Sequence, residues 1–480
     1  MPHAQSLATN TLWNALERFS TMGIQLVCTF LLGRFLTPAD FGLVGMLVVF
    51  TLIGNTLTES GFSQALIREE RADQRTLSTV FWTNLVLSLL VYTLLYCCAP
   101  LIASFYHQPA LVDISRITFL VIPLNALSLI HFTLFQRELQ FRPMCLVSVS
   151  ASLVSCTAAI LWAWQTQSVW ALVLQNVLAY ALRTLGYWLV LRWHPSLQYS
   201  FQRLRQLFAF SSNLLITGLL GNVFNNIYTL LIGRYYGATQ AGYFVQADRI
   251  RIVASASSTQ VVQSVSYPVL SRINHEGGDL RTGYQHILLT TLLLVGFFMT
   301  LLVNVSEDLM QLLMGSPAWR VSGQYLVALG IAGILYPLHA VNQNILMVKG
   351  LGQHILWLEV SRRAILVLLL IIGLHYRVEL FVWTYALYSF LLIFLNLRIC
   401  GRPIGYTLRH QLHDIWPILS ALGIMLVVGQ CSNHILSLQN IYLRLCLTLL
   451  ISVAIGYLLI RRTDTYHQAM TLARITTKRG

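Results

Sequence analysis

The sequence predicts an all-α integral membrane protein, and two features of its composition carry that prediction. Of the 480 residues, 56% are hydrophobic and only 10% are charged, whereas soluble proteins average about 25% charged residues. The apolar residues also come in stretches near the roughly 20 residues that a helix needs to cross a bilayer. We therefore expect a polytopic bundle of about fourteen transmembrane helices.

The expected spans are joined by connectors too short to hold a soluble domain. The first six are expected at 10–35, 40–66, 77–104, 112–135, 144–165 and 169–192. The next six are expected at 207–234, 241–270, 284–305, 321–347, 353–374 and 379–399, and the last two at 413–431 and 441–460. We group them into an N-terminal six-helix half (1–200), a C-terminal six-helix half (201–405), and two accessory helices with a tail (406–480).

The basic residues lie mostly in the connectors, and they favour one side of the membrane. Arginine-rich connectors alternate with connectors such as 106–112 and 165–168, which contain neither lysine nor arginine. Because basic loops stay in the cytoplasm, this alternation places both termini there. The net charge of +14 follows from the same bias, so we expect no nucleic acid partner.

Motifs of enzymes and metal sites are missing from the sequence. No nucleotide-binding loop, HExxH motif or metal-spaced group of histidines and cysteines is present. The eight cysteines lie in or at the ends of apolar segments, as expected of small buried hydrophobic residues. We therefore expect no cofactor, no metal ion and no catalytic residue.

An internal repeat relates the two predicted halves. Thr29, Leu31, Gly33, Arg34 and Gly42 recur 200 positions later as Thr229, Leu231, Gly233, Arg234 and Gly242. Both sets end one span and open the next, and they lie six spans apart. This pattern predicts a parallel repeat about an axis along the membrane normal, a plan that places the substrate site between the halves. The alternative is a recurring turn signal without common descent.

The first span is unusually polar for a membrane helix. Polar residues recur at three- and four-residue steps and form one stripe, made of Asn10, Asn14, Glu17, Thr21 and Gln25, with Arg18 beside it. A charge at the centre of a span costs about 2.5 to 3.5 kcal/mol on insertion scales. We therefore expect this helix to line a cavity. A Glu–Arg pair satisfied inside the bundle is the alternative.

Polar faces on three helices of each half predict one shared cavity. The candidate substrate-binding residues are Arg18, Arg116, Arg249, Arg251, Asn14, Asn55 and Asn225, and the candidate gating or ion-coupling residues are Glu17, Glu59 and Asp248. Interhelical hydrogen bonding is the alternative for any single asparagine. The cavity cations are arginines, which bind phosphate and carboxylate through a planar fork. We therefore expect an anionic, oxygen-rich substrate.

The chain resembles the Wzx-type polysaccharide flippases of the multidrug/oligosaccharidyl-lipid/polysaccharide (MOP) exporter superfamily, in the group of lipopolysaccharide biosynthesis and colanic acid exporters. Segments 13–18, 32–42 and 59–68 carry the resemblance, and a Gly-Arg-x-Leu-x-Pro turn at 33–38 is its most specific part. The resemblance implies a MATE-like fold in the bacterial inner membrane. It also implies alternating access that moves undecaprenyl-pyrophosphate-linked oligosaccharide across the bilayer, for O-antigen, capsule or exopolysaccharide synthesis.

The same resemblance implies membrane lipids as neighbours, and a polysaccharide polymerase with its chain-length machinery as partners. Two other functions remain open. A multidrug antiporter would share the fold, but a cavity rich in arginine would repel the cationic drugs typical of that class. A membrane-embedded polysaccharide polymerase or ligase would need residues outside the membrane to hold sugars, and the outward connectors are short.

Overall fold

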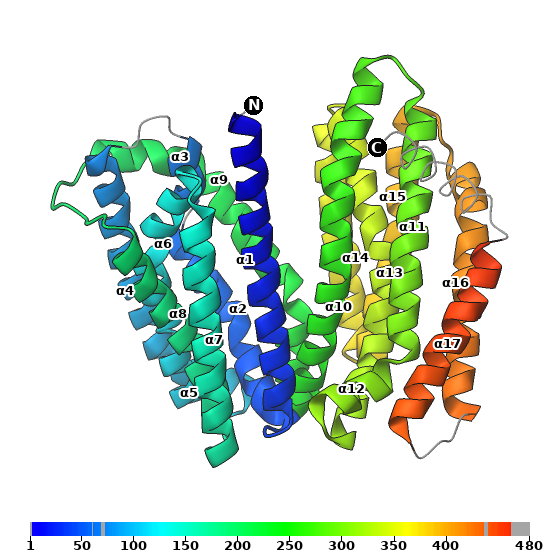
Figure 1. The fold of residues 1–480 in the computed structure, drawn as a ribbon, viewed down its shortest axis with the longest axis horizontal. Helices are drawn as coiled ribbons and strands as arrows, with labels where there is room; N and C mark the ends of the chain where they lie inside the picture. The colour runs from blue at the N-terminus through cyan, green and yellow to red at the C-terminus, as the bar shows by residue number, and fades with distance from the viewer. Residues whose placement is uncertain (1, 60, 69–72, 436–439, 462–480) are drawn as a thin grey trace. The chain divides into compact units, whose positions relative to one another are not determined.

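The computed structural model of the chain describes residues 2–59, 61–68, 73–435 and 440–461, and all regular structure in these ranges is helical (Figure 1). Within them, ten helices are long and apolar enough to cross a membrane. The number rises to eleven if the bent pair formed by α9 (Phe201–Asn225) and α10 (Ile227–His275) is one span. The prediction of an all-α, multi-pass membrane protein is confirmed, and the count of about fourteen spans stays a prediction.

The helices form two compact units, Met1–Gly242 and Tyr243–Gly480. The first unit contains α1 (Pro2–Gly33), α2 (Pro38–Glu59), α3 (Phe62–Arg68), α4 (Gln74–Tyr106), α5 (Leu111–Thr118), α6 (Val121–Arg137), α7 (Phe141–Thr166), α8 (Trp170–Val190), α9 and the start of α10. In this unit α7 packs on both α1 and α8, and α6 packs on both α4 and α8. The 3.6-residue period of the apolar side chains is what lets each helix bury one face.

The second unit is built around α13. It contains the rest of α10, α11 (Leu280–Asn304), α12 (Ser306–Met314), the 3-10 helix η1 (Pro317–Trp319), α13 (Arg320–Val348), α14 (Gly352–Gly373), α15 (Val378–Gly401), the 3-10 helix η2 (Arg402–Ile404), α16 (Leu408–Ile435) and α17 (Ile441–Ile460). α13 packs against α11, α12 and α15, and a leucine-rich core joins α11, α13, α15 and α16.

A short helix recurs at matching places in the two units. The expected fourth span, 112–135, is two helices, because the chain leaves regular helix at residues 119–120 between α5 and α6. In the second unit, α12 likewise stands between α11 and α13. The order long helix, short helix, long helix therefore occurs twice, as the internal repeat predicts.

The segment between the predicted halves, residues 191–200, is fastened to α4. Trp193 Nε1 donates to Gln74 Oε1 (2.6 Å), and Gln74 Nε2 donates to the His194 carbonyl (2.7 Å). Further along the segment, Trp82 Nε1 donates to the Ser196 carbonyl (2.9 Å). These bonds satisfy backbone groups that hydrocarbon could not. The segment is therefore part of the first unit and not a free tether.

The compact units and the predicted halves divide the chain at different places. The sequence repeat divides the bundle at residues 200/201, but α9 packs on α2, α3 and α4 of the first unit. Contacts and repeats measure different properties, so the division into two six-helix halves and an accessory pair stays a prediction.

Candidate functional site

The first helix exposes both a polar face and an apolar face. α1 packs on α7, and Leu12 and Phe19 on another side are 69% and 57% exposed, as suits contact with lipid. Asn14, Arg18 and Gln25 are exposed on a third side, four and seven residues apart along the helix. Hydrocarbon cannot solvate these three side chains. This face must therefore border water or a polar ligand.

Glu17 points in a different direction from its neighbour Arg18. It is half-buried and lies on the side of α1 toward Cys145 of α7 and Tyr187 of α8. Successive residues of a helix are turned by about 100° relative to each other. The structure thus separates Glu17, which faces α7, from the exposed polar face of Asn14 and Arg18.

Glu59, the last residue of α2, lies in a polar network across three helices. Asn125 of α6 is its hub: its Nδ2 donates to Glu59 Oε1 (3.0 Å) and to Asn55 Oδ1 (3.4 Å). On the other side, Arg183 of α8 donates from Nη2 to Asn125 Oδ1 (3.4 Å), and its guanidinium lies over the Tyr180 ring at 4.4 Å. The network brings together two candidate site residues, Asn55 and Glu59, with Asn125 and Arg183, two polar residues of the expected spans that lie outside the candidate set.

This arrangement differs from the simplest expectation for Glu59. We expect from the sequence that Glu59 pairs with an arginine, with Arg18 as a candidate. In the structure the nearby guanidinium belongs to Arg183 and reaches the acid through an intervening amide. Arg183 lies within α8 and is half-buried. One positive and one negative charge in a low-dielectric setting favour each other strongly. The pair therefore explains how two charges are tolerated on facing membrane helices.

Arg116 and Asn225 stand apart from this network. The Arg116 guanidinium lies over the Tyr96 ring of α4 at 4.5 Å, and the Tyr92 hydroxyl donates to the Arg116 carbonyl (3.3 Å). Asn225 is exposed at the end of α9, where the chain bends by 42° into α10. The structure therefore connects Arg116 with α4, and it leaves Asn225 exposed at a break between helices.

In the second unit, Asp248 and Arg251 form an ion pair within α10. Arg251 Nε donates to Asp248 Oδ1 (2.7 Å), and Arg251 Nη2 lies 2.6 Å from the same oxygen. Arg251 is buried, and its guanidinium lies 5.3 Å from the centre of the Tyr385 ring. Arg249 is half-buried. Arg251 is thus already neutralised by Asp248, whereas the sequence grouped both as separate cavity residues.

The hub residue Asn125, on a polar face of the expected fourth span, also carries a second sequence signal. It stands in Pro123-Leu-Asn-Ala, and the second half contains Pro337-Leu-His-Ala, which puts His339 at the matching place. His339 of α13 accepts at Nδ1 from Asn396 Nδ2 of α15 (2.8 Å). The pairs α6–α8 and α13–α15 thus each hold a polar contact, half-buried in the first pair and buried in the second. Among the described residues, the contact of the first pair is also linked to an acid, Glu59.

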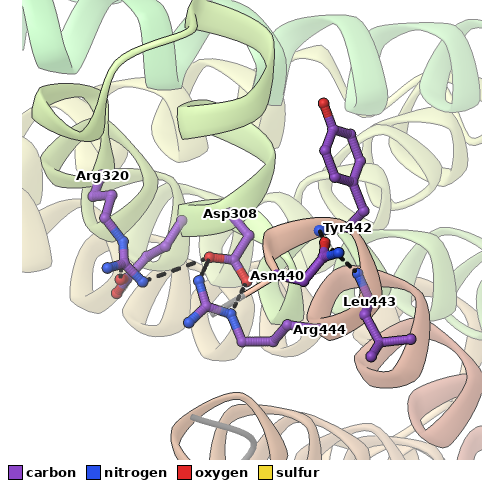
Figure 2. A network of polar contacts seen from close by, with 7 residues as sticks. Asp308, Arg320, Asn440, Tyr442, Leu443 and Arg444 are labelled. Carbon is purple, nitrogen blue, oxygen red and sulfur yellow. Dashed lines mark hydrogen bonds and ion pairs between the residues drawn. The ribbon is translucent and has the colours of Figure 1, made fainter. Parts of the chain in front are cut away.

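An ion-pair cluster lies at the start of the last helix, α17 (Figure 2). Asp308 of α12 is fully buried, and both of its oxygens pair with Arg444 of α17, with Arg444 Nε 2.6 Å from Oδ2. Arg320 adds a longer contact of 3.5 Å to Asp308 Oδ1. Asn440 caps α17 by accepting from the Tyr442 backbone N–H (3.0 Å). Because Arg444 is the one charged residue in 441–460, hydropathy predicts a mostly apolar span there and does not reveal the cluster.

Comparison with known proteins places the chain among proteins of polysaccharide biosynthesis. The family described as "Polysaccharide biosynthesis protein" matches residues 31–322. The teichuronic acid biosynthesis protein TuaB of Bacillus subtilis (strain 168) is 27% identical over 70% of each chain. The succinoglycan biosynthesis transport protein ExoT of Rhizobium meliloti (strain 1021) is 28% identical over 73% of this chain and 70% of its own. The lipopolysaccharide biosynthesis protein WzxC of Escherichia coli (strain K12) is 25% identical over 70% of this chain and 69% of its own.

Two solved structures share the fold. The lipid II flippase MurJ in an inward closed conformation superimposes with a TM-score of 0.68 at 15% identity, covering 94% of this chain and 98% of its own. An inward-facing multidrug resistance transporter of the MATE family and MOP superfamily gives 0.62 at 14% identity, covering 82% of this chain and 98% of its own. These likenesses confirm the MOP/MATE-like fold that the sequence resemblance implied.

Proposed function

The chain belongs to the polysaccharide biosynthesis protein family, and from this membership we propose that it moves lipid-linked oligosaccharide repeat units across the bacterial inner membrane. The names of its relatives refer to three different polymers: teichuronic acid, succinoglycan and lipopolysaccharide. One relative is named a transport protein, and one structural neighbour is named a flippase of lipid II. Substrates that contain such different sugars can still share one component, an anionic lipid carrier. The proposed carrier is undecaprenyl pyrophosphate, moved by alternating access.

The exposed polar face of α1 is the observation that best supports this proposal. Arg18 lies on it with Asn14 and Gln25, away from both the α7 contact and the apolar exposed side. An arginine held on such a face offers a charged, bidentate donor to a phosphate. We assign Arg18, Asn14, Arg249 and Asn225 to substrate contact. We assign no direct substrate contact to Arg251, which is neutralised by Asp248, or to Arg116, whose guanidinium lies over the Tyr96 ring.

Uphill transport needs an energy source, and we propose Glu59 as the coupling carboxylate. Of the three predicted acids, Glu17 faces α7 and Asp248 is paired with Arg251, whereas Glu59 is held by an amide hydrogen bond. Among the described residues Glu59 makes no direct ion pair, so it can exchange a proton or a sodium ion more readily than an acid locked in an ion pair. Glu59 is therefore the first residue to test for coupling.

The proposed function predicts where the substrate accumulates when the chain is missing. Cells without it should lack the surface polysaccharide and should retain lipid-linked repeat units on the cytoplasmic side. Arg18→Lys keeps the charge but loses the bidentate fork, so we expect partial export; Arg18→Ala should lose most export, and Arg18→Glu all of it. The measurements are surface polysaccharide and the sidedness of the lipid-linked units, normalised to protein in the membrane.

Arg272→Ala is the matched control, because Arg272 is highly exposed and, among the described residues, pairs with Glu276, the residue that follows the end of its helix. It should export normally. Full export by Arg18→Ala would remove the cationic face from the mechanism. Lipid-linked units that reach the outer leaflet without being joined would instead identify a polymerase or ligase. Altered drug sensitivity with normal polysaccharide would identify a multidrug antiporter.

A further inference from the structure

The two copies of the internal repeat touch each other through glycine. A Cβ atom built on Gly42 would lie 1.8 Å from the carbonyl oxygen of Ala238, and one built on Gly242 would lie 1.8 Å from the carbonyl oxygen of Pro38. Each Cβ would also lie close to the other glycine's nitrogen, at 3.0 and 3.1 Å. No side chain fits at either position. The hydrogen that replaces each Cβ points at a carbonyl oxygen, as in Cα–H···O contacts between helices.

These contacts are reciprocal. Pro38 and Ala238 occupy equivalent places 200 residues apart, as do Gly42 and Gly242. Residue 42 touches 238, and residue 242 touches 38, with equal distances in the two directions. An interface in which i contacts j while the equivalent of j contacts the equivalent of i contains a twofold axis. The pseudo-twofold axis of the repeat therefore passes between Gly42 and Gly242.

The chain breaks before both glycines, but by different means. Thr37 caps α2: its backbone N–H and its hydroxyl donate to Asp40 Oδ2 (2.9 and 2.6 Å), and Pro38 starts the helix. The matching position in the second copy is Gly237, with φ 87° and ψ 176° inside α10. Only glycine adopts that conformation readily. A break is therefore kept at the same place although the proline and aspartate are not.

We propose that the Gly42–Gly242 crossing is the pivot about which the two copies of the repeat turn during transport, an inference that rests on the proposed function. The contact is backbone on backbone, so a change of crossing angle separates no interlocked side chains. It lies on the symmetry axis, where both copies turn equally. Residues 201–242 also belong to the same compact unit as α2, so the crossing lies inside a unit that holds together.

Glycine-to-alanine variants test whether the crossing must stay bare. Gly42→Ala and Gly242→Ala should each lower flipping per folded molecule by at least about tenfold, and by equal amounts because the contact is reciprocal. The controls are Gly23→Ala in α1 and Gly221→Ala in α9, where an added Cβ meets no atom within 4 Å. They should flip like the unmodified chain. Folded Gly42→Ala protein with a normal rate per molecule would overturn the proposal.

A cross-link separates a pivot from a gate and needs no change at the glycines. With the eight native cysteines replaced, Ala39→Cys and Thr239→Cys can be joined by a flexible bis-maleimide. A pivot tolerates this link, so flipping should continue; a contact that opens in each cycle would be locked, and loss of flipping would overturn the proposal. A Gln25→Cys reporter on the exposed face of α1, labelled from either side, records alternation even if lipid-linked oligosaccharide is not the substrate. A failure of the proposed function can therefore be distinguished from a failure of the pivot proposal.

Discussion

Glu59 is the residue at which charge and hydrogen bonding can be separated most cleanly. Its Oε1 accepts from Asn125 Nδ2 at 3.0 Å, and a glutamine side chain can present a carbonyl oxygen at the same place. Glu59→Gln should therefore keep the network with Asn125 and Asn55 and lose only the charge. We expect export to fall at least about tenfold, equivalent to about 1.4 kcal/mol, while the amount of folded protein in the membrane is unchanged.

The matched control for this variant is Glu276→Gln. Glu276 is 60% exposed in its side chain and, in the part of the chain that the structure describes, pairs with Arg272 near the end of α10. Exposed ion pairs contribute little, so this variant should be normal in both assays. Export at the normal rate by Glu59→Gln would exclude a coupling role. A shared loss of export and of folded protein would assign Glu59 to the stability of the network instead.

At the scale of elements, the cluster of Asp308 and Arg444 fixes α17 to α12 (Figure 2). Asp308 is 1% exposed, so removing Arg444 leaves a buried charge with only the longer contact to Arg320 among the described residues. We expect Arg444→Leu to destabilise the protein by about 3 to 5 kcal/mol, and the double variant Asp308→Leu, Arg444→Leu to recover part of that loss. The measurement is thermal unfolding in detergent, with Arg272→Ala as the exposed control.

The double-variant cycle distinguishes a true pair from two independent contributions. If the losses of the single variants simply add in the double variant, the two side chains do not stabilise each other. Arg320 is a second cation near Asp308, at 3.5 Å, so part of the charge stays compensated after Arg444 is removed. A loss well below 3 kcal/mol would therefore indicate that Arg320 takes over.

The bounds of the helices were predictable from the sequence where a change in hydropathy marks the end of a helix. The spans expected at 77–104, 144–165 and 284–305 agree within a few residues with α4, α7 and α11. The break of α10 at Gly237 also falls in the expected connector between 234 and 241. The division of the fourth span into α5 and α6 was not predicted, because apolar residues continue through residues 119–120 and hydropathy carries no signal there.

The site was predictable only in part, because helix rotation decides which polar residues meet. Sequence periodicity identified a polar stripe on α1 that includes Asn14 and Gln25, with Arg18 beside it. Which residues bond to Asn125 was not predicted, since it depends on how α2, α6 and α8 are turned toward one another. Comparing the two copies of the repeat gives information that periodicity does not. It matches Gly42 with Gly242, 200 residues later, and these two glycines are in contact in the structure.

At the scale of the whole molecule, the structure fixes which connectors share a side of the membrane. α4 has 33 residues, which at 1.5 Å per residue is about 50 Å and exceeds the roughly 30 Å hydrocarbon core. Arg75 and Gln108, at its two ends, must therefore lie on opposite sides. Gln74 bonds to Trp193 and His194, so the segment before α9 lies on the side of Arg75.

The positive-inside rule predicts which of the two sides is cytoplasmic, and reporter fusions test that prediction. We expect cytoplasmic signals at Arg75, at Arg203 and at Gly480, which lies outside the described residues, and a periplasmic signal at Gln108. The bonds between α4 and residues 193–194 tie the results at Arg75 and Arg203 together, so opposite signals at these two positions would contradict the fold itself. A uniform inversion of all four signals would contradict only the charge rule. In that case Arg18, on α1, would have to act on a substrate approaching from the other side.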